Sequence, residues 1–169
     1  ESFVDDLAGA VQASPVAAER IHFEITETAA VARLSRAREL MSALKSLDCR
    51  FILDDFGKGL SSLGYLKNLP LDFLKIDGHF VRGISDDPID RAMVKMINEI
   101  GHTMRLITIA EYVENDAILA HITNLGIDMA QGFGICKPLI DLCDVRQGRA
   151  PPWADKAMPD PPPPPAGLL

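Results

Sequence analysis

Short apolar segments alternate with amphipathic segments along most of the chain, and this alternation is what most constrains the fold. Such short apolar runs are typical of strands that are covered on both faces. Parallel strands joined by helices build either a doubly wound sheet or a (β/α)8 barrel. We predict five strands, over residues 21–26, 50–55, 73–77, 105–111 and 129–133.

Helix signals fill the intervals between these strands. The apolar residues form one stripe along residues 34–47 and another along residues 88–102. Asp87 before Pro88 is a typical helix start, because an N-cap side chain then precedes a proline at the first helical position. Shorter helices are predicted over residues 16–20, 62–68 and 115–125.

The helix and strand pattern ends at about residue 145, where a proline-rich segment begins. We therefore predict one α/β domain over residues 1–145, followed by an extended, disordered tail over residues 146–169. The first residue is Glu rather than Met, so we expect the chain to be a piece of a longer protein.

Net charge, cysteine content and the length of apolar runs indicate which partners and which cell compartment to expect. The net charge is -7, which argues against a broad nucleic-acid footprint, so we expect no DNA partner. The three cysteines lack metal-ligand spacing, and we expect free thiols in a reducing compartment. No apolar run approaches the roughly 18 residues of a membrane span. We expect a cytoplasmic domain, whose parent protein is free to carry a membrane anchor upstream.

Polar residues stand at or near the carboxyl end of every predicted strand. The clearest case is the apolar run 51–53, which leads directly into Asp54 and Asp55. Carboxyl ends of parallel strands meet at one rim, so these side chains should converge. The polar residues at the five ends are Glu24, Glu27, Asp54, Asp55, Lys75, Asp77, Glu111, Glu114 and Gln131.

Seven carboxylates around one lysine are unfavourable unless cations bind among them. Oxygen ligands favour Mg²⁺, Mn²⁺ or Ca²⁺ over zinc, and a pair of such ions is the usual device for phosphodiester cleavage. Each residue alone has a simpler interpretation, such as a helix cap, a solvated turn or a structural ion pair. The convergence of all five ends nevertheless favours a metal site. No Gly-x-Ser-x-Gly elbow and no phosphate-binding P-loop is present in the sequence.

At these same residues the sequence resembles the EAL domain family of bacterial cyclic di-GMP phosphodiesterases. The order and spacing of the motifs match those of the family over about residues 15–140. The sequence is most similar to EAL domains of tandem GGDEF–EAL proteins. The matching segments are FEITET at 23–28, LDDFGKGLSSL at 53–63, YLKNLPLDFLKID at 65–77, IAEYVE at 109–114 and QGF at 131–133.

The resemblance implies a TIM-like (β/α)8 barrel of EAL type that hydrolyses cyclic di-GMP to pGpG. It implies two Mg²⁺ or Mn²⁺ ions per complete site, with Ca²⁺ inhibiting because it accepts a looser geometry. The implied partners are cyclic di-GMP, a second copy of the domain in a homodimer, and GGDEF and sensor domains upstream.

The resemblance also assigns roles to individual residues. Lys75 corresponds to the lysine near the attacking water and phosphate, and Glu27 to the acid that anchors the loop at 56–63 and links metal binding to dimerisation. Glu111 corresponds to an acid that binds metal or acts as general base. The implied metal ligands are Glu24, Asp54, Asp55 and Glu111, and the implied supporting residues are Gln131, Asp77 and Glu114.

The sequence departs from the family pattern in two ways. Tyr112 stands where many members have glycine. The glutamate of the Glu-Ala-Leu motif and an asparagine ligand belong to an N-terminal third that we expect this chain to lack, leaving a partial, open barrel. The alternatives are therefore a non-catalytic cyclic di-GMP receptor or interaction domain, or an unrelated metal-dependent barrel hydrolase. We expect the isolated chain to show weak or no turnover.

Overall fold

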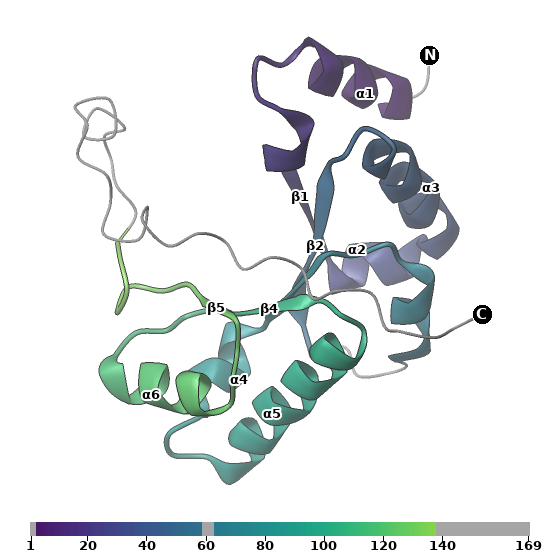
Figure 1. Ribbon diagram of the computed structural model, residues 1–169. Coiled ribbons are helices and arrows are strands. Elements are labelled where there is room, and N and C mark those ends of the chain that lie inside the picture. Colours follow the sequence, from purple (N-terminus) through teal and green to yellow (C-terminus); the bar gives the residue numbers. More distant parts are fainter. Residues whose placement is uncertain (1–2, 59–62, 138–169) are drawn as a thin grey trace, which may run out of the picture.

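The protein contains a parallel β-sheet with helices packed against it, shown in Figure 1. The computed structural model describes residues 3–58 and 63–137. All five predicted strands are present, all are parallel, and their order in the sheet follows their order in the sequence. They are β1 (His22–Thr26), β2 (Arg50–Phe56), β3 (Phe73–Ile76), β4 (Ile107–Ala110) and β5 (Met129–Ala130). This sequential parallel order confirms the predicted βα architecture.

Most helices connect successive strands, and one, at residues 3–13, precedes the first strand. Three helices, at residues 3–13, 27–32 and 78–83, are not among those predicted from the sequence. Among the described residues, no helix is long and apolar enough to cross a membrane. The predicted tail at 146–169 lies outside the described residues. The helices are α1 (Phe3–Ala13), α2 (Glu27–Ala32), α3 (Leu34–Lys45), α4 (Gly78–Gly83), α5 (Pro88–Thr103) and α6 (Asp116–Asn124), with 3₁₀ turns at Ala18–Arg20 and Leu63–Asn68.

Helices α2 and α4 were missed because each has only six residues and starts directly where a strand ends. The side chain of Thr26 at the end of β1 accepts a hydrogen bond from the backbone N–H of Ala29 and caps α2. Asp77, just after β3, accepts a hydrogen bond from the N–H of His79 and caps α4. Polar residues at strand ends therefore also begin helices in this fold.

The alternation of side chains along β3 separates two hydrophobic layers. Leu74 and Ile76 face the helices, where they join a large core that includes residues of α3, α5 and α6. Phe73 faces the other side and packs with a smaller inner cluster, and Lys75 shares that side by the period of two. The inner cluster consists of Ile52, Phe73, Ile107 and Ile109, with Met129 packed against it. The inner face is thus apolar towards the amino ends of the strands and polar at their carboxyl ends, where Lys75 lies.

We predict that Leu74→Ala lowers the free energy of unfolding by about 2–5 kcal/mol, because it leaves a cavity in the helix-side core. The side chain is fully buried at 0% exposure. Ile89 on α5 is 70% exposed and serves as the control, for which Ile89→Ala should change the free energy by about 0.5 kcal/mol or less. Urea unfolding compares the two variants; equal effects would contradict this assignment of the core.

Candidate metal centre

Asp54 and Asp55 are neighbours in β2, yet both carboxylates reach one site. In a regular strand, adjacent side chains point to opposite faces. Here the pairing of β2 with β3 shifts register between Leu53 and Phe56, and Asp55 has a φ of 57°. This left-handed conformation is strained for a residue with a side chain, by about 1–3 kcal/mol. The bulge therefore turns Asp55 towards the side that Asp54 already occupies.

Together with Glu111, just beyond β4, the two aspartates form a compact set of oxygen atoms. One carboxylate oxygen from each of the three residues lies within 4.8 Å of the others. Burial raises the pKa of Glu111; the neighbouring carboxylates of Asp54 and Asp55 add to that increase, while Lys75 opposes it. Burial first, and the neighbouring acids second, therefore make a negative charge on Glu111 unfavourable.

Lys75 is the cation at the centre of this rim. Its Nζ lies 2.7 Å from Oε1 of Glu111, 3.0 Å from Oδ1 of Asp54 and 3.4 Å from Oε2 of Glu24. Burial alone would lower the pKa of Lys75, but its close contacts with the carboxylates of Glu111 and Asp54 outweigh burial and raise it. Lys75 therefore stays charged, and one ammonium group is shared among three carboxylates.

The carboxylate set fits a hard divalent cation. The Oδ1 atom of Asp54 is buried and makes no hydrogen bond of good geometry, although the Lys75 ammonium lies 3.0 Å away. This ammonium group is shared with Glu111 and Glu24, so a further cation would stabilise the buried oxygen. The donors are all oxygens, which suits Mg²⁺, Mn²⁺ or Ca²⁺. Asp54, Asp55 and Glu111 are the residues that would hold such an ion.

Asp77 lies beside this set but serves other groups. Its Oδ2 forms an ion pair of 2.6 Å with Nζ of Lys58, and the same Nζ lies 3.1 Å from Oδ1 of Asp55. Burial would raise the pKa of Asp77, but Lys58 and the N–H of His79 outweigh burial and lower it. Asp77 therefore remains ionised, anchoring Lys58 and capping α4.

Glu27 lies outside the carboxylate set and binds the backbone of the turn that follows Asp55. Its buried carboxylate accepts hydrogen bonds from the N–H of Gly57 at 3.1 Å and from the hydroxyl of Tyr65 at 2.8 Å. Gly57 has a φ of 114°, and a Cβ atom there would lie 2.8 Å from the ring of Phe80. The conformation and the close approach both require glycine at this turn.

The structure does not bring Glu114 and Gln131 into the carboxylate set. Glu114 lies 3.7 Å from the Nε of Arg82, whose guanidinium group stacks 3.9 Å above the ring of Tyr112. Gln131 is exposed, and the described contacts are those of its backbone with Ala110 and Val113. Both residues stand on the rim next to the acids.

Sequence reasoning missed two residues that shape the site, Lys58 and Tyr65. Lys58 follows Asp55 by three residues, and this short spacing was its only signal. Tyr65 is 38 residues from Glu27 in the sequence, so only the folded structure shows their contact. Both residues bind acids that the sequence analysis had already singled out.

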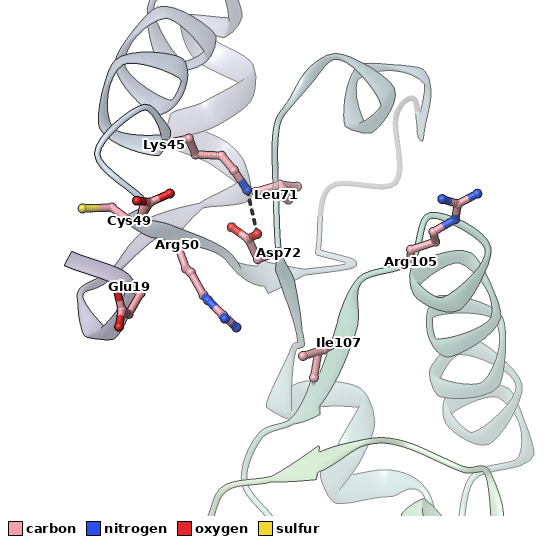
Figure 2. Close-up of a pocket in the computed structure, with 9 residues that line it drawn as sticks. Glu19, Lys45, Cys49, Arg50, Leu71, Asp72, Arg105 and Ile107 are labelled. Carbon is pink, nitrogen blue, oxygen red and sulfur yellow. Dashed lines mark hydrogen bonds and ion pairs between the residues drawn. The ribbon is translucent and has the colours of Figure 1, made fainter. Parts of the chain in front are cut away.

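A cavity of about 440 Å³ lies at the opposite, amino-terminal end of the sheet (Figure 2). Its charges balance, with three basic and three acidic side chains, and Lys45 is paired with Asp72 at 2.6 Å. This cavity therefore lacks the excess negative charge of the rim, and we do not assign the metal site or catalysis to it. Its lining residues are Glu19, Lys45, Asp48, Cys49, Arg50, Leu71, Asp72, Arg105 and Ile107.

Comparison with known proteins gives clear relatives. The chain is 40% identical over 151 residues to the cyclic di-GMP phosphodiesterase PdeB of Shewanella oneidensis, an alignment that covers 88% of this chain and 18% of PdeB. It is 34% identical over 136 residues to the bifunctional diguanylate cyclase/cyclic di-GMP phosphodiesterase MucR of Pseudomonas aeruginosa, covering 80% of this chain and 20% of MucR. The chain thus spans about a fifth of the length of these relatives.

Solved structures share the fold. The MucR phosphodiesterase in complex with c-di-GMP matches with a TM-score of 0.76 and 34% identity, over 81% of this chain and 56% of that one. The manganese/cyclic di-GMP complex of Klebsiella pneumoniae BlrP1 matches with a TM-score of 0.74 and 27% identity, over 80% of this chain and 34% of that one. A calcium complex of BlrP1 gives a TM-score of 0.73.

These neighbours confirm the expected partial barrel of TIM type, because the five-stranded parallel sheet aligns with just over half of the MucR phosphodiesterase chain. The family model for the EAL domain matches residues 1–138. The chain therefore belongs to the EAL domain family.

Proposed function

We propose that this domain hydrolyses cyclic di-GMP to linear pGpG. The observation that carries the proposal is the convergence of Asp54, Asp55 and Glu111 within 4.8 Å of one another beside the buried Lys75. The name of PdeB and the cyclic di-GMP bound to MucR and BlrP1 support the choice of substrate.

Asp54, Asp55 and Glu111 would hold divalent metal ions, and Glu24 on the neighbouring strand β1 would be a further ligand. We propose two ions per complete site, Mg²⁺ or Mn²⁺ in the active enzyme, with Ca²⁺ as an inhibitor. When bound, such ions lower the pKa of water and stabilise negative charge on the phosphate.

Lys75 supplies a fixed positive charge for the phosphate. Its three carboxylate contacts hold the ammonium group in place, so little reorganisation is needed as charge develops on the phosphate oxygens. In the proposed reaction, water adds to one phosphorus atom and the bond from that phosphorus to the 3′ oxygen breaks. The product carries a 5′-phosphate and a free 3′-hydroxyl, which accounts for all atoms.

The remaining rim residues have supporting roles in this proposal. Glu27 holds the backbone N–H of Gly57 and so fixes the chain directly after the bulge that aims Asp55. Asp77 caps α4 and anchors Lys58. Gln131 and Glu114 are exposed and lie outside the carboxylate set, and in this proposal they contact the bound nucleotide.

We further propose that the domain acts as a homodimer, with GGDEF and sensor domains upstream, in the cytoplasm. The diguanylate cyclase activity in the name of MucR supports the proposed GGDEF domain.

Asp54→Ala should abolish turnover, because Asp54 contributes to the oxygen set and lies against Lys75. Release of pGpG by the full protein with Mn²⁺ measures the effect. Asp86→Asn removes an exposed acid outside the site and should leave turnover unchanged. Binding of cyclic di-GMP by the wild type without product formation would instead indicate a receptor.

Lys75→Met should lower kcat by about 100-fold at saturating Mn²⁺, because the ammonium group is lost from the phosphate site. The substitution also leaves buried acids without their counter-ion, so thermal unfolding must be followed in parallel. A variant that stays folded and keeps wild-type kcat would remove Lys75 from the proposed mechanism.

Chelation of divalent ions should abolish turnover, and Mg²⁺ or Mn²⁺ should restore it. Ca²⁺ should inhibit in competition with Mn²⁺, because it accepts the same oxygen ligands at longer distances and with looser geometry. Steady-state rates at fixed Mn²⁺ and rising Ca²⁺ test this expectation; full activity with Ca²⁺ alone would contradict it.

A further inference from the structure

We propose that Lys58 is a tethered counter-ion that competes with a divalent metal ion for Asp55 and so sets the metal concentration at which the site fills. This inference rests on the metal site proposed above. It concerns a lysine that lies outside the set of ligands and outside the motif residues assigned a role.

The two lysines at the rim differ in how firmly they are held. The side chain of Lys75 is 6% exposed and is fixed by three carboxylates. The side chain of Lys58 is 59% exposed and contacts two, Asp55 at 3.1 Å and Asp77 at 2.6 Å. Of these two lysines, Lys58 is therefore the one that can move when the site takes up a metal ion.

The two contacts of Lys58 also differ in strength. Asp77 has a side chain that is only 3% exposed, so its pairing with Lys58 is costly to break. The side chain of Asp55 is 43% exposed, and a pair of this kind at the surface contributes little. Lys58 can thus release Asp55 while it keeps its anchor on Asp77.

Lys58 and a metal ion would compete for Asp55, because Asp55 belongs both to the carboxylate set and to the ion pair with Lys58. One of its oxygens contributes to the set with Asp54 and Glu111, and its Oδ1 lies against the Lys58 ammonium. A metal ion on Asp55 would meet a positive charge only a few ångströms away. At such a separation, Coulomb repulsion in water with physiological salt screening weakens divalent binding by about fivefold.

The test is the dissociation constant of Mn²⁺, measured on the full protein by calorimetry and by the electron paramagnetic resonance signal of free Mn²⁺. Lys58→Met should bind Mn²⁺ about fivefold more tightly than the wild type, and the difference should shrink at high salt because the charges are screened. Lys58→Arg keeps the charge and should bind like the wild type. Lys95→Met removes an equally exposed lysine on α5 and should also bind like the wild type.

Two outcomes would overturn the inference. If Lys58→Met binds Mn²⁺ no more tightly than the wild type, while Asp54→Ala abolishes binding, the metal site stands and the role of Lys58 is wrong. If the wild type, Lys58→Met and Asp54→Ala all fail to bind Mn²⁺, the proposed metal site fails together with the inference.

Discussion

The ammonium group of Lys75 is the interaction on which the arrangement of the rim depends. It joins β3 to acids on or just beyond β1, β2 and β4, at distances of 2.7–3.4 Å. A charge buried to this degree is stable only with such partners, and removing either side leaves an uncompensated charge. The same ammonium group brings the three acids together but neutralises them only in part, because one positive charge faces three negative ones.

A second constraint is local and concerns the backbone at the end of β2. The left-handed conformation of Asp55 is unfavourable by itself, and a hydrogen bond to the chain directly after it holds the turn. Glu27 accepts this hydrogen bond from the N–H of Gly57, whereas the exposed Lys58 contacts the Asp55 carboxylate without fixing it. The acids of the rim therefore include both candidate ligands and the groups that position them.

Much of the fold and part of the site could be predicted from the sequence. Short apolar runs gave the five strands, and parallel topology predicted that Asp54, Asp55, Lys75 and Glu111 would meet. The bulge at Asp55 could not be predicted, because it arises from pairing with β3 rather than from local sequence. The ion pair between Lys58 and Asp77 and the contact of Tyr65 with Glu27 depend on folding in the same way. The sequence also could not distinguish Glu114 from the acids of the carboxylate set, because all of them follow strand ends at the same rim of the sheet.

Anomalous scattering from crystals of the protein grown with Mn²⁺ would show whether the rim holds a metal ion. We expect an anomalous peak in contact with carboxylate oxygens of Asp54, Asp55 and Glu111, with Nζ of Lys58 withdrawn from Asp55 and still paired with Asp77. A well-ordered rim without such a peak, or a peak whose ligands exclude Asp54 and Asp55, would contradict it.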